Sequence, residues 1–250
     1  MIMPRPRKRH LQQELFRPHG GKRPGAGRPT NRKRPSERHK VRPRLRASEP
    51  VHVTVRVLPA IGWLRKHDMF LAIREATICL VKNEDMRIVH MSIQGTHIHM
   101  IVEAESRLAL ARNMQRFLVS AAKQINRVYR ERTGKKRRGS VFADRYHARI
   151  MRSPREVRNC IVYVLNNWRH HGEDKKAIAR SWNVDPYSSG IGFVGWRERA
   201  DEPFRWRGPA SYQQLIVWEP RTYLLSTLWK KHDLIRFHEV PGGRACADDD

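Results

Sequence analysis

Six consecutive segments alternate between the two-residue period of strands and the 3.6-residue period of helices, and their order leaves few folds open. The first, Val51–Val57, alternates apolar and polar residues and predicts a half-buried strand. Apolar residues spaced three and four positions apart predict a helix over His67–Lys82. The other four segments are predicted as strand, strand, helix and strand, over Met86–Gln94, Gly95–Glu103, Leu108–Arg132 and the second half of Ser140–Arg152.

The order β-α-β-β-α-β is that of a ferredoxin-like split βαβ fold. We therefore expect an α+β domain over residues 51–172, with a ferredoxin-like sheet and helices on one face. Ser153-Pro154-Arg155-Glu156 has the signature of a capping box and begins a further helix, which Gly172 ends. Residues 173–250 are expected to form a C-terminal extension that packs on this core, with one more helix over Tyr223–His232 and several tryptophans to bury.

The first fifty residues differ from the rest in composition. They hold 16 Lys or Arg against 3 Glu, and 8 of the chain's 15 prolines. Such a segment cannot bury enough apolar surface to offset its ordering entropy, so a disordered basic arm that binds DNA is predicted over residues 1–50. Gly21–Pro29, which contains Arg23 and Arg28, resembles the Gly-Arg-Pro core of AT-hook peptides of the DNA minor groove. A solvated linker is the alternative conformation, and its charge would still bind phosphate.

The whole chain carries 51 Lys or Arg against 24 Asp or Glu, a net charge of +27. A charge of this size repels itself unless a polyanion neutralises it, which predicts a nucleic-acid partner. The three cysteines have no metal-binding spacing and indicate neither a zinc knuckle nor a disulfide framework. No apolar run approaches the ~18 residues that span a bilayer. We expect no membrane contact and a cytoplasmic, nucleoid-associated protein.

The histidines of His97-Ile98-His99 lie on either side of one apolar residue in the third predicted strand. Because alternate strand residues share a face, His97 and His99 point the same way and Ile98 points to the other layer. Two imidazoles ~7 Å apart along a strand can converge on one divalent ion. The alternative is ordinary polar surface on an exposed strand. Two histidines do not complete a coordination shell, so a third ligand must come from elsewhere in the chain.

Tyr163 and Asn167 are one turn apart on the capped helix, so both side chains leave it on one face, about 6 Å apart at Cβ. Asn166 faces roughly 100° away and is a candidate DNA contact. Tyr129 and Tyr146 are rival tyrosines, either packing residues or stacking platforms for bases. Tyr163 is preferred because it alone has a polar ligand candidate one turn later, although a buried core tyrosine is its alternative reading.

In this order and spacing, three pieces resemble the HUH single-strand endonucleases, and among them the REP-associated branch of the single-tyrosine transposases. They are Gly95-Thr96-His97-Ile98-His99-Met100-Ile101-Val102, Gly139-Ser140-Val141-Phe142-Ala143-Asp144-Arg145-Tyr146, and Tyr163-Val164-Leu165-Asn166-Asn167 with Gly172 beyond. The resemblance covers about Val51 to Gly172. One departure is that the Asn-Pro usual after the tyrosine helix is Asn167-Trp168 here.

The resemblance implies a transposase that cuts single-stranded DNA beside a hairpin, through a 5′-phosphotyrosine intermediate, in DNA transposition and recombination. It implies Tyr163 as the nucleophile, with His97, His99 and Asn167 as ligands of a divalent ion, Mg²⁺ or Mn²⁺. Single-stranded or hairpin DNA is then the partner of a monomer or homodimer. The expected DNA contacts, besides the arm, are Arg23, Arg28, Lys135, Lys136, Arg137, Arg138, Arg145, Tyr146 and Asn166.

Two other functions fit parts of the pattern. A non-catalytic nucleic-acid-binding protein is one, because the same β-α-β-β-α-β order serves RNA-recognition modules. Those modules stack bases on paired aromatics, whereas the sheet here offers aliphatic and histidine side chains. A replication-initiation or relaxase nuclease of the HUH group is the other, since it also uses His-x-His and tyrosine. Such proteins often carry further tyrosines or a helicase, and no Walker-type phosphate loop is present in the sequence.

Overall fold

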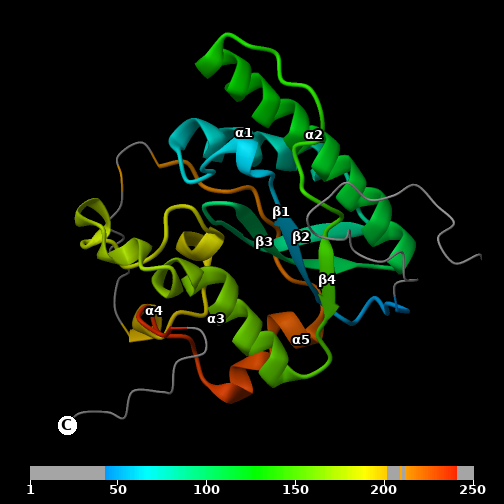
Figure 1. Ribbon diagram of the computed structural model, residues 1–250. Helices are drawn as coiled ribbons and strands as arrows, with labels where there is room; N and C mark the ends of the chain where they lie inside the picture. The colour runs from blue at the N-terminus through cyan, green and yellow to red at the C-terminus, as the bar shows by residue number, and fades with distance from the viewer. Residues whose placement is uncertain (1–42, 202–208, 210–211, 241–250) are drawn as a thin grey trace, which may run out of the picture. The chain divides into compact units, whose positions relative to one another are not determined.

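Four antiparallel strands form the central sheet, in the order β2-β3-β1-β4 (Figure 1). The computed structural model describes residues 43–201, 209 and 212–240. The strands are β1 (Val51–Arg56), β2 (Met86–Ile93), β3 (His97–Ala104) and β4 (His147–Ile150). β2 and β3 form the predicted hairpin, and β1 lies between β3 and β4. The predicted α+β class and its split βαβ sheet are confirmed.

The long helices occur where apolar periodicity predicts them, with differences at their ends. The α-helices are α1 (His67–Thr77), α2 (Arg107–Thr133), α3 (Pro154–His170), α4 (Glu198–Asp201) and α5 (Tyr223–Ser226). The described residues also form six short 3₁₀ helices, which span Pro59–Ile61, Ile78–Leu80, Glu173–Lys175, Ala177–Ala179, Ser189–Gly192 and Leu228–His232. The first long helix is therefore shorter than predicted, and the helix expected over Tyr223–His232 is divided in two. The predicted capping box begins α3, where the Glu156 amide donates to Ser153 Oγ over 3.2 Å.

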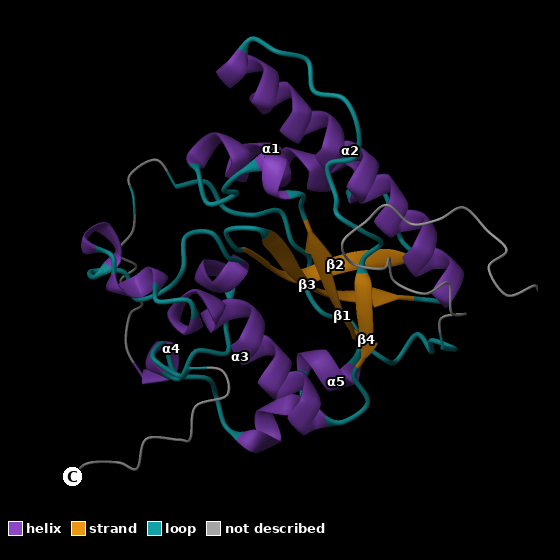
Figure 2. Ribbon diagram, viewed as in Figure 1, coloured by secondary structure: helices purple, strands orange, loops and turns teal. Residues whose placement is uncertain are grey.

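The two faces of the sheet are covered by different helices (Figure 2). On one face the alternate residues of β1 and β3, such as Val53 and Ile98, pack with α1 and α2. On the other face Ile101 packs with α3 and the C-terminal extension. The prediction of helices on one face is correct for α1 and α2 and wrong for α3. The apolar stripe of α3, which includes Ile161, needs buried surface, and only the second face is left to supply it.

Residues 43–50 pack against the domain. Leu45 is part of its apolar core, and Glu49 accepts a hydrogen bond from Arg152 Nε over 3.1 Å. The Pro50 carbonyl accepts from the Met151 amide at the end of β4. The disordered arm predicted over residues 1–50 therefore does not reach residue 50, because Leu45 packs in the core and Glu49 pairs with Arg152 of the domain. Residues 1–42 of that prediction, with the Gly-Arg-Pro motif, lie outside the described residues.

The C-terminal extension covers α3. A segment that we call the strap, residues 233–239, runs along the helix and bonds to its polar side chains. Arg158 pairs with the Glu239 carboxylate through two bonds of 2.7 and 3.0 Å, and Arg169 Nε donates to the Phe237 carbonyl over 2.7 Å. These contacts hold α3 at a fixed position over the sheet.

No helix in the described part of the chain is long and apolar enough to cross a membrane.

Candidate active site

A cluster of imidazoles occupies the face of the sheet that α3 covers. His97 and His99 of β3 point to this face, with ring centroids 4.6 Å apart, and Ile98 points into the opposite core as predicted. β1 adds His52, whose ring stacks on His99 at 5.3 Å between centroids. Thr54 lies on the same face and pairs with His99 in the strand register. The strand alternation of β1 and β3 thus brings together four polar side chains from two neighbouring strands.

One stripe of α3 faces this cluster. The Tyr163 ring lies 4.9 Å from the His99 ring and 5.7 Å from the His52 ring, between centroids. Two turns later, at the end of the helix, the His171 ring lies 5.8 Å from the His97 ring. Asn167 lies on the same stripe, one turn from each of them. Along the helix, Asn167 therefore lies between the residue that contacts His99 and the residue that contacts His97.

Hydrogen bonds of His99 engage one ring nitrogen and leave the other available. His99 Nδ1 lies 3.2 Å from His52 Nε2 and 3.2 Å from Thr54 Oγ1. His99 Nε2 and both polar atoms of the Asn167 side chain are buried and have no hydrogen-bond partner in the part of the chain described. Buried polar atoms are normally bonded, so orphans on two facing elements need an explanation. A ligand held between β3 and α3 would satisfy them.

Burial keeps these imidazoles neutral. Desolvation, helped by the neighbouring His97, lowers the pKa of His99 to about 2. Desolvation also lowers the pKa values of His97 and His52 to about 4 each. Neutral imidazoles have the lone pairs that a metal ion requires. Burial raises the pKa of the Tyr163 phenol, with a smaller contribution from Cys160, so this hydroxyl keeps its proton at neutral pH.

The predicted metal ligands are His97, His99 and Asn167. Among the residues that the structure describes, no three His, Cys, Asp or Glu side chains are grouped so as to hold a metal ion. The predicted set has two imidazoles and one amide, so its third member belongs to none of those four residue types. The orphaned His99 Nε2 and the orphaned Asn167 amide fit an ion between strand and helix.

Of the residues predicted to contact DNA, several lie on the surface. Lys135, Lys136 and Arg138 are exposed in the loop after α2, and Arg145 is exposed before β4. Arg137 in the same loop is partly exposed and donates to the Gly139 carbonyl. Arg23 and Arg28 lie outside the described residues.

Two of the predicted DNA contacts are wrong. Tyr146 is buried in the core between the sheet and α1 and α2, so its ring cannot stack on a base. Asn166 is fully buried, and its Nδ2 donates to the Arg236 and Glu239 carbonyls over 3.1 and 2.9 Å. The prediction failed for Asn166 because the helical wheel shows only that it faces away from Tyr163, and the strap covers that direction.

Asn166→Ala is expected to lower the free energy of unfolding by about 1–3 kcal/mol, because two partly buried carbonyls of the strap lose their donor. Urea denaturation would measure this loss. DNA affinity should stay at the wild-type level, since Asn166 is not on the surface. Weaker DNA binding by a fully folded Asn166→Ala protein would contradict the structural role.

The sequence analysis missed three residues of the candidate active site: His52, Thr54 and His171. The alternation in Val51–Val57 places His52 and Thr54 on the polar face of β1, and this signal was available. The alternation alone does not show that β1 pairs with β3, and this pairing is what sets Thr54 opposite His99. His171 follows the last helical residue, where sequence periodicity no longer fixes a direction.

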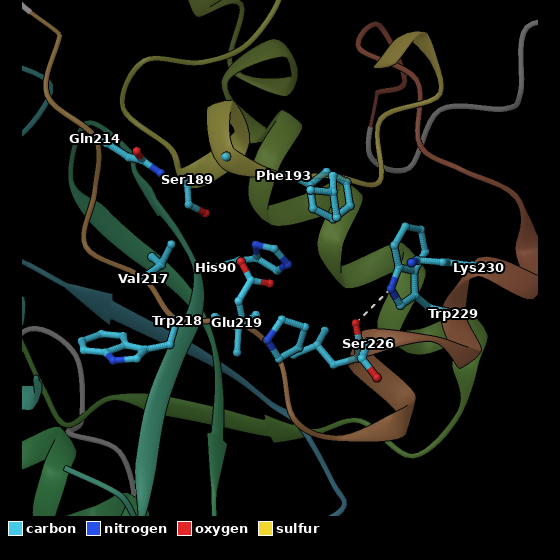
Figure 3. Close-up of a pocket in the computed structure, with 15 residues that line it drawn as sticks. His90, Ser189, Phe193, Gln214, Val217, Trp218, Glu219, Ser226, Trp229 and Lys230 are labelled. Atoms are coloured by element: carbon cyan, nitrogen blue, oxygen red, sulfur yellow. Dashed lines mark hydrogen bonds between the residues drawn. The ribbon is translucent and has the colours of Figure 1, made fainter. Parts of the chain in front are cut away.

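A pocket elsewhere in the chain lies between β2 and the C-terminal extension. Figure 3 shows His90, Phe193 and Trp229 around it, with Glu219 and Lys230 among the other lining residues. Burial lowers the pKa of His90 to about 4, and its ring packs edge-on against Phe193. None of the residues that line this pocket belongs to the imidazole cluster. The pocket is therefore separate from the candidate active site.

Comparison with known proteins identifies one family. Residues 51–167 match the family described as IS200-like transposases. Among solved structures, the chain is similar to a REP-associated tyrosine transposase bound to a REP hairpin, with 18% identity over 73% of this chain and 100% of that one, and a TM-score of 0.48. It is also similar to a bacterial tRNA(His) guanylyltransferase (Thg1)-like protein in complex with GTP, with 17% identity over 54% and 71% of the two chains and a TM-score of 0.38. No curated protein sequence matches the chain.

Proposed function

Because residues 51–167 match the family of IS200-like transposases, we propose that this chain is a metal-dependent endonuclease and strand transferase acting on single-stranded DNA beside hairpins. Tyr163 is its nucleophile. The observation that carries this proposal is the position of the Tyr163 ring, 4.9 Å from His99, on the helix stripe that also presents the orphaned Asn167 amide. The proposed nucleophile, Tyr163, thus lies close to polar atoms that could bind a metal ion.

The reaction is a transesterification. Tyr163 Oη forms a bond to phosphorus, the bond from phosphorus to the 3′-oxygen breaks, and the products are a 5′-phosphotyrosine and a free 3′-OH. The phenol loses its proton as the new bond forms, and the departing 3′-oxygen gains one. Because a phenolate is a good leaving group, a 3′-OH can attack the phosphotyrosine in the reverse direction and rejoin DNA without ATP.

The ligand atoms would be an imidazole nitrogen of His97, Nε2 of His99 and Oδ1 of Asn167. A bound Mg²⁺ or Mn²⁺ supplies charge neutralisation at a non-bridging phosphate oxygen. The chain itself orients one ligand: His52 and Thr54 engage Nδ1 of His99 and leave its Nε2 for the ion. The strap holds α3, and with it Tyr163 and Asn167, at one distance from the strand.

Basic side chains beside the cluster support a polyanionic substrate. Arg56, His147 and Arg149 are exposed on the same face of β1 and β4, where the alternation of the strands continues. The exposed lysines and arginines of residues 135–138 and the net charge of +27 add long-range attraction for DNA in the cytoplasm. These residues position the phosphate backbone and leave the chemistry to the cluster.

A covalent adduct would test the proposal directly. The protein is incubated with end-labelled hairpin oligonucleotides bearing single-stranded flanks, with Mn²⁺ or with EDTA, and separated on a denaturing gel. A protein–DNA band that needs Mn²⁺ is expected, together with a shorter DNA fragment ending in 3′-OH. Tight hairpin binding with no adduct in the presence of either Mg²⁺ or Mn²⁺ would instead indicate a non-catalytic DNA-binding protein.

Thr54→Val is expected to lower Mn²⁺ affinity about 10- to 100-fold while the protein stays folded. The two side chains have nearly the same shape, but valine lacks the hydroxyl that lies 3.2 Å from His99 Nδ1. Mn²⁺ binding is measured by electron paramagnetic resonance, independently of cleavage. Thr77→Val, which removes a buried hydroxyl from α1, is the control and should bind Mn²⁺ as the wild type does. Unchanged affinity in Thr54→Val would show that Thr54 does not orient His99.

A further inference from the structure

Trp63 is a large aromatic side chain exposed beside the histidine strand. It lies in the loop between β1 and α1, and 43% of its surface is exposed. Its six-membered ring lies against Gly95, in the turn that begins β3 two residues before His97. The Leu64 amide donates to the Gly95 carbonyl over 2.8 Å, which fastens the loop to the turn. The indole is therefore held in place at the edge of the candidate site.

The close approach of the Trp63 ring explains why position 95 is a glycine. A Cβ at Gly95 would collide with the indole of Trp63. The φ angle of Gly95 is not positive, so the backbone at this turn does not itself require glycine. The sequence thus keeps room at Gly95 for an aromatic ring that remains partly exposed to solvent.

A positive charge lies over the same ring. The Lys176 ammonium is 5.5 Å from the centroid of the Trp63 ring, and Glu173 accepts a hydrogen bond from it over 2.6 Å. The Lys176 side chain is 54% exposed. Glu173 and Lys176 follow the end of α3, where the His171 ring lies beside the His97 ring. An exposed indole and a cation therefore lie together at the end of the cluster formed by His97 and His171.

We propose that Trp63 is a stacking platform for one nucleobase of the single-stranded DNA next to the phosphate attacked by Tyr163, and that Lys176 pairs with a phosphate of the same strand. Every base has a π face, so an exposed indole binds any of them without reading sequence. The base replaces the ammonium over the ring, and the flexible lysine turns to the DNA backbone. This inference rests on the proposed function, because it assigns the substrate strand to this site.

An abasic scan would locate the stacked base. Single abasic nucleotides replace each base of the flank in turn, and affinity is measured by fluorescence anisotropy in EDTA, where no cleavage occurs. Trp63→Ala should weaken binding between about 5-fold and about 150-fold. One abasic position should cost the wild type a similar factor and cost Trp63→Ala almost nothing. Trp63→Phe should bind with intermediate affinity, and Tyr223→Ala, which removes an exposed aromatic of α5, should bind as the wild type does.

Gly95→Ala provides a second, independent variant. The added Cβ displaces the indole without changing its chemistry, so affinity should fall as in Trp63→Ala, and the two changes together should cost no more than either alone. Wild-type affinity in Gly95→Ala, or identical abasic profiles with and without Trp63, would overturn the stack. The Tyr163 adduct is scored separately at saturating DNA with Mn²⁺. Its absence from the wild type would overturn the proposed function, whereas an adduct without the abasic signature would overturn only the assignment of Trp63.

Discussion

Tyr163→Phe should abolish the covalent protein–DNA adduct, reducing its rate of formation by ~10³-fold or more. Phenylalanine keeps the ring that packs edge-on against His99 and His52, so α3 should stay in place. It removes the hydroxyl that forms the bond to phosphorus. Hairpin affinity should remain near the wild-type value, because phosphate contacts come from the basic surface. The measurement is adduct yield over time on a denaturing gel, beside anisotropy for binding.

Tyr129→Phe and Tyr146→Phe are the matched controls, since each removes one tyrosine hydroxyl from another part of the domain. Tyr129 lies on α2, away from the face that α3 covers, and Tyr146 is buried in the opposite core. Both variants should form the adduct at the wild-type rate. Peptide mass mapping of the wild-type adduct should find DNA on Tyr163. DNA attached to Tyr129 or Tyr146, with Tyr163→Phe still reactive, would mean that the wrong helix has been assigned.

Periodicity predicted the elements that carry the site because strands and helices fix the direction of neighbouring side chains. The period of two was enough to place His97 and His99 on one face and Ile98 on the other. A spacing of one turn was enough to place Tyr163 and Asn167 on one stripe of α3. The roles of these residues remain proposals, but their grouping follows from local geometry.

Contacts between distant segments were beyond local geometry. The face on which α3 packs depends on which apolar surfaces remain after α1 and α2 have covered the first face. The burial of Asn166 depends on the strap, whose residues 233–239 have no regular period to reveal them. Tyr146 directly precedes β4, and local pattern did not show that its ring turns into the core. Each of these errors concerns a helix or a side chain whose surroundings are set by residues far away in the sequence.

His99→Ala should lower Mn²⁺-dependent cleavage by at least ~100-fold. The loss of a residue that merely orients a metal ligand commonly costs about 10–100-fold in affinity, so the loss of the ligand should cost at least the upper end of that range. Mn²⁺ affinity, followed by electron paramagnetic resonance, should fall in parallel with cleavage. Raising the Mn²⁺ concentration should restore part of the rate, because His97 and Asn167 would still offer two ligands.

The control for His99→Ala is His90→Ala, which also removes a buried imidazole from the sheet but one that packs on Phe193. Both variants lose comparable packing, so a general loss of stability would affect them alike. Only His99→Ala should lose metal affinity, because His99 Nε2 is the orphaned buried nitrogen of the cluster. A double variant, His97→Ala with His99→Ala, that still cleaves at the wild-type rate would remove the metal from the mechanism. Tyr163 would then have to attack a phosphate whose charge is neutralised by arginine and lysine alone.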